Sequence, residues 1–398
     1  MGCRLAALGM HHALGRGGDE IWPRLVAGDR SGLVERSDLV PGRTGWYAPA
    51  RGPLPDLPAG LEEYTCRNNQ LALSALEQIR EEVDAAIAEL GAHRVGVVVG
   101  SSTSGFSRAE WAFREREKTG ELPGGFALAQ LEFGGLSEFV ALASGAAGPR
   151  QCPSTACSTG AKALITARSL LALGFCDAVI AGAVDTLCGL TANGFGALQA
   201  TSARPTNPMS VNRDGLTLGE GAALFLVTRE ASGVQLLGGG ESSDAHHMSA
   251  PHPEGRGAEQ CMRAALADAA IEPSDVAYLN LHGTGTPQND AMESAAVARV
   301  FAGVPCSSTK PLVGHTLGAS GAIEAGFCWM VLDRRGAPGD ELTLPPHCYD
   351  GEADPEIAAL ALVSPDTHVA AAAPAAVMTN SFGFGGSNCA LVLGDGRS

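Results

Sequence analysis

The chain of 398 residues is long enough to bury a large core, as one big domain or as two fused halves. Its 45% hydrophobic and 18% charged residues are ordinary for a soluble globular enzyme, and the net charge of -16 argues against a nucleic-acid partner. The longest apolar stretch, residues 161–184, contains charged residues, and the N-terminus carries no signal-peptide pattern, so we expect a cytoplasmic protein without membrane insertion. The 11 cysteines include no CxxC pair, which argues against a zinc site or a disulfide framework.

Strand-like and helix-like segments alternate along the chain. We expect, in order, strand 4–10, helix 69–90, strand 94–100, a helix after Cys157, strands 177–184 and 222–227, strand 234–237, helix 257–270, strand 276–282, helices 291–300 and 319–332, and strands near 377–379 and 389–393. The Pro- and Gly-rich tracts 41–60 and 336–357 are expected to be surface loops. This alternation predicts an α/β fold with mainly buried strands. Because the pattern restarts near residue 231, we predict two similar halves, 1–230 and 231–398.

Cys157 lies in the sequence TACSTGAKALITARSLLAL, where small residues precede a helix-forming run. A thiol is nucleophilic as the thiolate, and its free pKa of about 8.5 leaves little thiolate at neutral pH. The partial positive charge and free N–H groups of a helix N-terminus favour the anion. Cys157 is therefore a candidate nucleophile, and the alternative is a buried structural cysteine.

Two later segments carry candidate acid–base groups. In NLHGTGTPQND, an apolar strand leads into His282, and Asp290 is a plausible helix N-cap. In STKPLVGHTLGASGAIE, Lys310 is expected to close a strand, His315 to lie in a turn and Glu324 to lie on the next helix. The alternatives are a histidine packed at a strand end and a solvated lysine.

Two further motifs contain glycine turns or histidines. NSFGFGGSN carries Phe382 and Phe384 in a glycine turn; it does not fit a phosphate loop, and a hairpin with aromatic packing is the alternative. DAHHMSAPHP contains His246, His247 and His252, whose spacing is poor for a metal site. We therefore predict no bound metal.

Taken together and in this order, the four segments resemble the β-ketoacyl-acyl carrier protein synthases, which are condensing enzymes of the thiolase superfamily. The stretches RDGLTLGEGAA at 213–223 and SSDAHHMSAPHPEG at 242–255 match further family motifs, with His246 where the family usually has tyrosine. The resemblance covers nearly the whole chain and implies a thiolase-like fold with layers αβαβα. It is closest to stand-alone type II elongating enzymes, and RNNQLALSALEQI at 67–79 inclines toward the polyene-making branch.

The resemblance assigns catalytic roles to five side chains. It makes Cys157 the acyl-accepting nucleophile and makes His282 and His315 the paired histidines of a Cys-His-His triad. Lys310 corresponds to the lysine placed before the second histidine, and Glu324 to a glutamate nine positions after it, expected to anchor that lysine or its loop. The implied activity is an acyltransferase reaction, the decarboxylative condensation of an acyl-enzyme with a malonyl-carrier.

The same resemblance assigns the binding groups. The backbone N–H groups of Cys157 and Phe384 correspond to the family's oxyanion hole, and Phe384 also corresponds to the gate over the acyl pocket. Thr284 and Thr286 match threonines that hydrogen-bond the phosphopantetheine arm, and Phe382 is a further candidate substrate contact. No cofactor of the chain itself is implied, because the substrates travel on the phosphopantetheine of an acyl carrier protein.

Partners and alternatives follow from the same resemblance. The family forms dimers near the strand before the cysteine, here residues 151–156, and either a homodimer or a heterodimer with a related subunit is consistent with the sequence. Arg67 and Arg204 are either carrier-docking residues or ordinary surface arginines. The alternatives are a silent chain-length-factor subunit, a scaffold, and a thiolase or acyl-CoA acyltransferase, for which Cys389 would be the late second cysteine. The acyl primer, the product length and the pathway (fatty acid, polyketide or aryl polyene) stay open.

Overall fold

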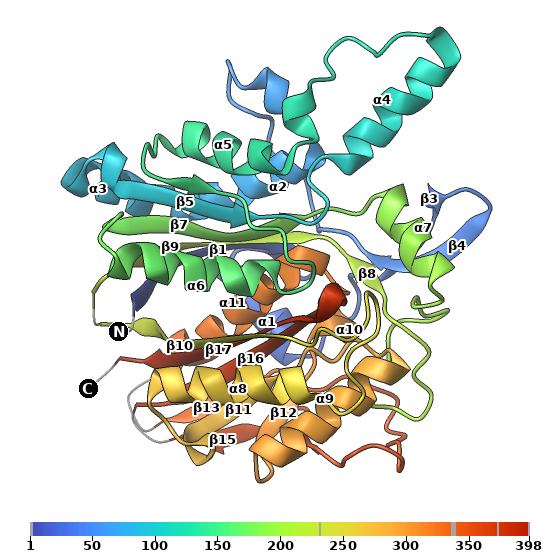
Figure 1. Ribbon diagram of the computed structural model, residues 1–398, viewed down its shortest axis with the longest axis vertical. Coiled ribbons are helices and arrows are strands. Elements are labelled where there is room, and N and C mark those ends of the chain that lie inside the picture. The colour runs from blue at the N-terminus through green and yellow to red at the C-terminus, as the bar shows by residue number, and fades with distance from the viewer. Residues whose placement is uncertain (1–2, 231, 336–339, 372–373, 397–398) are drawn as a thin grey trace.

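The computed structural model describes residues 3–230, 232–335, 340–371 and 374–396, and it arranges them in five layers (Figure 1). Two sheets alternate with three layers of helices, so both faces of each sheet are covered. The outer layers contain α2 (Arg67–Leu76), α3 (Arg80–Leu90) and α5 (Phe133–Ser144) on one side and α8 (Arg256–Ala269) and α9 (Pro287–Val300) on the other. The central layer contains α6 (Thr159–Ala172) and α11 (Ser320–Asp333), with α1 (Gly18–Val26) nearby. This is the αβαβα arrangement expected from the resemblance.

The two halves of the chain repeat one strand topology. The first half has the order β6-β5-β7-β9-β1, built from β1 (Cys3–His12), β5 (Val95–Gly100), β6 (Arg150–Gln151), β7 (Ala178–Asp185) and β9 (Gly221–Thr228). The second has the order β12-β11-β16-β17-β10, built from β10 (Val234–Ser243), β11 (Val276–Asn280), β12 (Pro305–Ser307), β16 (Ala376–Gly383) and β17 (Ser387–Asp395), with β14 (Ala361–Leu362) at the edge. In each half these five strands make four pairings: the first two in the order given are parallel and the other two are antiparallel. The prediction of two similar α/β halves is confirmed.

A short antiparallel contact joins the two sheets. Cys3 pairs with Leu236 and Arg4 with Gln235, so β1 and β10 connect the halves at one edge. The strands VGVVVG (β5) and AVIAGAVD (β7) are buried at every position because helices cover both of their faces. Such strands therefore read as continuous apolar runs rather than as an alternating pattern.

Smaller elements surround this framework. They are β2 (Gly15–Arg16), β3 (Val34–Val40), β4 (Arg43–Ala48), α4 (Phe106–Thr119), α7 (Gly189–Ala197), β8 (Leu218–Gly219), α10 (Lys310–Val313), β13 (Glu341–Thr343) and β15 (His368–Ala370). Helix α4 projects from the body at the upper right of Figure 1. Across the described residues, no helix is both long and apolar enough to cross a bilayer.

The structure corrects several expected elements. The helix expected at 69–90 is two helices, α2 and α3, separated by a 3-10 turn at Glu77–Ile79. That turn places the Gln78 side chain against β1, where it bonds both the N–H and the C=O of Met10. The tract 41–60 includes strand β4, and 336–357 includes β13, while residues 336–339 lie outside the described residues.

Two expectations about strand ends also change. Strand β11 ends at Asn280, so His282 lies in the loop after it. Lys310 does not close a strand: β12 ends at Ser307, and Lys310 begins the short helix α10. Pro311 occupies an early position of that helix, where a missing N–H is tolerated, which explains how proline fits there.

Candidate active site

Cys157 lies in a tight turn at the start of the central helix α6. Ala156, just before it, has a φ of 53°, a left-handed conformation that is uncommon for a residue with a Cβ atom. Thr159 holds the turn by accepting a hydrogen bond from the Thr155 N–H at 2.8 Å and donating one to the Ala156 carbonyl at 2.7 Å. Ser158 is the N-cap residue of α6. The sulfur of Cys157 is therefore held at the N-terminal end of a largely buried helix.

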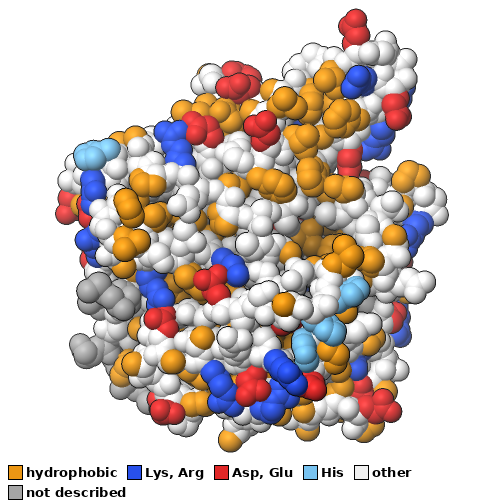
Figure 2. All heavy atoms as spheres, in the orientation of Figure 1, with side chains coloured by type: hydrophobic (Ala, Val, Ile, Leu, Met, Phe, Trp, Pro, Cys, Tyr) orange, Lys and Arg blue, Asp and Glu red, His pale blue; other side chains and the backbone are white. Residues whose placement is uncertain are grey.

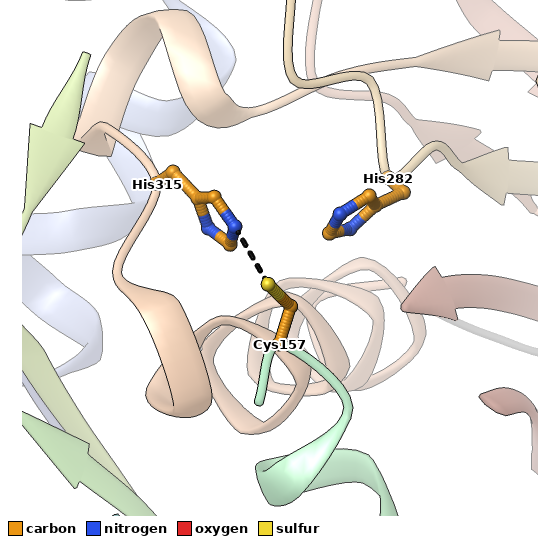
Figure 3. A group of neighbouring side chains, drawn as sticks. All are labelled: Cys157, His282 and His315. Atoms are coloured by element: carbon orange, nitrogen blue, oxygen red, sulfur yellow. Dashed lines mark hydrogen bonds between the residues drawn. The ribbon is translucent and has the colours of Figure 1, made fainter. Parts of the chain in front are cut away.

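His315 contacts this sulfur directly. Its Nε2 atom lies 3.1 Å from Cys157 Sγ, and a dashed line marks this contact in Figure 3. The backbone of His315 is paired with the strand β8 region, because its N–H donates to Thr217 at 2.6 Å and its C=O accepts from Gly219 at 2.9 Å. The RDGLTLGEGAA motif thus fixes the second histidine of the site.

His282 approaches the same point from the loop after β11, in the same half of the chain as His315. The centroids of the His282 and His315 rings lie 5.3 Å apart, and the rings are nearly perpendicular. The Cys157 sulfur and one ring nitrogen of each histidine all lie within 4.8 Å of one another. The buried carboxylate of Glu293 holds the loop by accepting the N–H groups of His282 and Gly283, each at 2.7 Å. Loops far apart in the sequence therefore bring one sulfur and two imidazoles together (Figure 3).

Lys310 and Glu324 form a buried ion pair behind His282. The side chains are each 1% exposed, and Lys310 Nζ lies 2.5 Å from Glu324 Oε1. Lys310 Nζ also lies 3.4 Å from His282 Nδ1. Because lysine offers only N–H donors, Nδ1 of His282 is the acceptor, and the ring proton is on Nε2. Lys310 thus fixes the His282 tautomer that presents an N–H to the site.

Burial sets the charge states of the reacting groups. It lowers the pKa of His282 and of His315 well below 6.5, and the positive charge of Lys310 acts in the same direction. Both imidazoles are therefore neutral at physiological pH. Burial raises the pKa of Glu324 to about 7, against the opposing effect of Lys310.

Cys157 lies in surroundings that favour its protonated form. Burial raises the pKa of the Cys157 thiol to about 11, while a hydrogen bond from the Phe384 N–H and the charge of Lys310 pull it down. His315 Nε2 is the basic atom within reach of that thiol.

A cavity leads to these three side chains. Its lining includes the predicted residues Thr284, Thr286, Phe382 and Phe384. The Thr284 and Thr286 hydroxyls lie 2.9 Å apart, and the Phe382 ring packs edge-on against His282. Phe384 contacts Phe195 of α7, with 5.3 Å between ring centroids. The predicted binding residues therefore share one cavity with the triad.

Two acidic residues have roles that differ from the sequence interpretation or were missed by it. Asp290 is not the N-cap of α9, which is Thr286; it lies in the first turn and accepts the N–H groups of Met209 and Gly285. Glu293 was missed, although an acidic residue on the apolar side of a predicted helix is a usable signal for a buried polar role.

Arg67 bonds the buried carboxylate of Glu220 through two guanidinium nitrogens, so its charge compensates that carboxylate. This contact favours a structural role for Arg67 over carrier docking. Arg204 is exposed and bonds the Asn212 carbonyl, so its docking role stays a prediction.

Comparison with known proteins assigns both halves to one family. Residues 63–232 match the model of the beta-ketoacyl synthase N-terminal domain, and residues 234–340 match that of the C-terminal domain. A 3-oxoacyl-[acyl-carrier-protein] synthase 2 of Staphylococcus aureus (strain COL) is 34% identical, covering 82% of this chain and 81% of that protein. Its namesake from Coxiella burnetii is 33% identical, covering 98% of this chain and 97% of that protein.

Solved structures agree with this assignment. The complex of the ketosynthase ApeO with its chain length factor ApeC from Xenorhabdus doucetiae matches with a TM-score of 0.92 and 42% identity, over 99% of this chain and 98% of that one. A beta-ketoacyl synthase from Burkholderia phymatum STM815 matches with a TM-score of 0.82 and 30% identity, over 99% of each chain. The chain belongs to the beta-ketoacyl synthase family and is a condensing enzyme of the acyltransferase class.

Proposed function

We propose that this enzyme condenses an acyl group held on Cys157 with a malonyl unit delivered by an acyl carrier protein, using His282 and His315 as the paired histidines. The observation that carries the proposal is the convergence of one sulfur and two imidazoles within 4.8 Å at a cavity. The S. aureus and C. burnetii relatives are named as synthases that act on acyl-carrier-linked substrates. In this proposal no cofactor belongs to the chain, and phosphopantetheine enters with the substrate.

The first step transfers the acyl group to the enzyme. The sulfur of Cys157 attacks the thioester carbonyl carbon while its proton passes to His315 Nε2, 3.1 Å away. The oxyanion is stabilised by the N–H groups of Cys157 and Phe384, each such donor being worth about 3 kcal/mol. The carrier thiolate then leaves and takes up the proton from His315. An acyl-Cys157 thioester and a free carrier thiol result.

The second step makes the carbon–carbon bond. The bond between the carboxylate and C2 of the malonyl group breaks, CO₂ leaves, and the electron pair forms an enolate on the thioester. His282 Nε2–H donates to the developing oxyanion, with its tautomer held by Lys310. The enolate carbon attacks the acyl carbonyl of Cys157, the carbon–sulfur bond breaks, and the released Cys157 thiolate takes up one proton from the solvent.

The two steps can be separated by mutation. We expect Cys157→Ala to abolish acyl-enzyme formation, seen by mass spectrometry of the intact protein, while malonyl-carrier decarboxylation continues. His282→Ala should still load acyl groups but lose condensation. His315→Ala should lose condensation and also load much more slowly, because it lacks the base that takes the Cys157 proton. Acyl loading on Cys157→Ala would overturn the nucleophile assignment, and normal product yield from a histidine variant would remove that histidine from the mechanism.

A metal site is a weaker interpretation of the same three side chains. A thiolate and two imidazoles within 4.8 Å are a plausible ligand set. The Lys310 ammonium lies 3.4 Å from Nδ1 of His282, however, and a positive charge at that distance opposes a second cation. A histidine that binds a metal through one ring nitrogen usually donates the N–H of its other ring nitrogen to an acceptor. The neighbour of His282 Nδ1 is instead the donor Lys310.

A silent-subunit role and a thiolase activity are also less well supported than condensation. A silent chain-length-factor role does not require a nucleophile, whereas Cys157, His282 and His315 form a complete constellation. A thiolase needs a second reactive cysteine, but Cys389 is 0% exposed within β17 and burial raises its pKa well above 9. Cys389 is therefore proposed to be structural.

We further propose that the chain works as a dimer with a related ketosynthase-like subunit, in aryl polyene synthesis in the cytoplasm. Support comes from the ApeO–ApeC match and from the ishigamide ketosynthase/chain length factor, which matches with a TM-score of 0.85. Large apolar side chains are exposed on the projecting segment that begins with α4, including Trp111, Phe113 and Leu128. Figure 2 shows hydrophobic side chains gathered over this part of the molecule.

The test is turnover with malonyl-carrier and a panel of acyl primers, with and without candidate partner subunits. Aromatic primers extended only in the presence of a related subunit would support both parts of this proposal. Full turnover by the isolated chain with saturated fatty acyl primers would contradict them.

A further inference from the structure

Asp185 is a buried carboxylate that the proposed mechanism does not use. It ends strand β7, is 0% exposed, and accepts six hydrogen bonds. The donors are Ser101 Oγ at 2.8 Å, Ser102 N at 2.8 Å, Ser102 Oγ at 2.7 Å, Thr103 N at 2.7 Å, Thr103 Oγ1 at 2.7 Å and Ala319 N at 3.1 Å. All six donors are neutral groups. Burying a carboxylate is costly unless donors replace the water it loses. Because moving any of these donors away would leave the carboxylate unsatisfied, the network holds the donors in place.

These hydrogen bonds join two segments that are far apart in the sequence. The turn 101–103 follows β5, whereas Ala319 is the residue directly before α11. Ser102 Oγ links them a second time, because it donates to Asp185 and accepts from the Gly318 N–H at 3.1 Å. A Cβ atom on Gly318 would lie 2.6 Å from the Asp185 Oδ2 atom, so only glycine allows this approach.

The joined segments lie next to both reacting groups. Gly318 comes three residues after His315, and a Cβ atom there would also lie 3.2 Å from the Cβ of Thr159, the first residue of α6. Cys157 comes two residues before Thr159. The N-terminal ends of α6 and α11 are therefore in contact where Asp185 anchors the second of them.

We infer that Asp185 is a positioning residue, which holds the start of α11 against the turn after β5 and thereby sets the distance from His315 to the Cys157 sulfur. The inference rests on the proposed function, because that distance matters when His315 takes the thiol proton. Asp185 acts through His315 and does not touch the substrate.

The charge of Asp185 gives a second, independent readout. It raises the pKa of the Cys157 thiol, in the same direction as Glu324 and against Lys310 and the Phe384 N–H. His282 and His315 also face the thiol and stay neutral, because their pKa values lie well below 6.5. Removing the charge of Asp185 should therefore lower the thiol pKa, which a purely structural change would not do.

The test is Asp185→Asn in the full-length chain. The amide keeps the size of the side chain but removes the charge and one acceptor, so the Ala319 N–H loses its partner. We expect the rate constant of acyl loading to fall about tenfold, as for the loss of a hydrogen bond to a charged group, with the KM for the acyl donor changed less than about twofold. The pH profile of Cys157 alkylation by iodoacetamide should move to lower pH.

Two further variants separate positioning from stability. Asp395 is also a buried carboxylate at the end of a strand, β17, and it pairs with Arg335. Asp395→Asn should lower the melting temperature but leave loading and the alkylation profile as in the wild type. Ser102→Ala removes the second link to Gly318 but keeps the charge, so it should slow loading without moving the alkylation profile. It also tests the inference if Asp185→Asn does not fold.

The outcomes are distinct. Wild-type protein that never loads an acyl group contradicts the proposed function itself. Wild-type protein that loads, together with an Asp185→Asn variant that matches it in loading rate and alkylation profile, overturns the positioning role alone. Unchanged loading by Ser102→Ala, with Asp185→Asn unfolded, also overturns it.

Discussion

At the scale of single residues, desolvation decides the charge states of the site. Cys157 is 5% exposed, and its thiol is protonated at neutral pH although it lies at a helix N-terminus. His282 and His315 are neutral for the same reason. A neutral imidazole can take the thiol proton or donate an N–H to an oxyanion, whereas a charged imidazolium cannot act as the base. Burial thus makes the site chemically competent over the physiological pH range.

The thiol pKa predicts how alkylation depends on pH. Because the pKa of Cys157 is about 11, the thiolate fraction should rise about tenfold for each pH unit between pH 7 and pH 9. The second-order rate constant of inactivation by iodoacetamide should follow that slope with no plateau in this range. A plateau below pH 8 would show that the resting cysteine is already a thiolate. Cys157→Ala is the control for labelling elsewhere.

The buried pair Lys310–Glu324 predicts a pH-dependent loss of stability. Lys310→Met leaves the Glu324 carboxylate without its cation, which costs about 3–5 kcal/mol when the carboxylate is charged. Burial already raises the pKa of Glu324 to about 7 with Lys310 present. In Lys310→Met the Glu324 pKa should be higher still, because the positive charge that lowers it is gone. A raised carboxyl pKa gives stability that is present at low pH and lost as pH rises through the folded-state value.

Urea unfolding at pH 6 and pH 9 measures this effect. Relative to wild type, Lys310→Met should be more strongly destabilised at pH 9 than at pH 6. The double variant Lys310→Met/Glu324→Gln should have much less of that additional pH dependence, because it removes the titrating group. Equal destabilisation of Lys310→Met at both pH values would contradict the uncompensated-charge explanation.

At the scale of elements, the site depends on how closely two central helices approach. Helix α6 carries Cys157 at its start, and α11 follows His315. A Cβ atom on Gly160 would lie 2.5 Å from the Ala322 N atom, and one on Gly321 would lie 2.7 Å from the Ala161 N atom. Glycine at these two positions lets the helix backbones touch, which brings the two loops that precede them together.

Substitution of one of these glycines tests the element. Gly160→Ala should force α6 and α11 apart, reducing stability by about 1–3 kcal/mol and slowing acyl loading more than tenfold. Gly194→Ala in α7 is the matched control, because no atom lies within 4 Å of its added Cβ, and it should be neutral or slightly stabilising. Thermal unfolding and the loading rate measure both effects. Wild-type loading by Gly160→Ala would show that the close approach is not needed.

At the scale of the whole molecule, the chain exposes apolar surface at one end. Helix α4 projects from the layered body, and its segment exposes Trp111, Phe113 and Leu128 to solvent (Figure 2). Several large exposed apolar side chains on one projecting segment favour an interaction surface there. The proposed ketosynthase-like subunit would cover them.

A charge placed on this surface tests the proposed assembly. Phe113→Glu should abolish association with the related subunit, measured by light scattering coupled to size-exclusion chromatography, because a carboxylate buried in an apolar interface is strongly unfavourable. Leu173→Glu is the control: Leu173 is 72% exposed in the loop after α6 and should leave association unchanged. Association of the Phe113→Glu variant at wild-type affinity would place the interface elsewhere.

Local patterns in the sequence were sufficient for most of the central strands and helices and for placing Cys157 at the start of a helix. Buried strands such as VGVVVG are readable because both faces are apolar, and the small residues before α6 mark Cys157 as a helix-start cysteine. The family resemblance supplied the roles proposed for His282, His315 and Lys310. The break at 77–79 and the position of Lys310 in α10 were not predicted, because they depend on contacts with distant strands.

The tertiary structure alone decided the distances, the charge states and the supporting carboxylates. A 3.1 Å contact between His315 and Cys157 joins residues 158 positions apart, and no local pattern encodes such a distance. The thiol pKa of about 11 arises mainly from burial by the whole fold, which the sequence around Cys157 does not reveal. Glu293 and Asp185 hold loops by accepting backbone N–H groups, and a carboxylate acquires that role only when folding brings the donors to it.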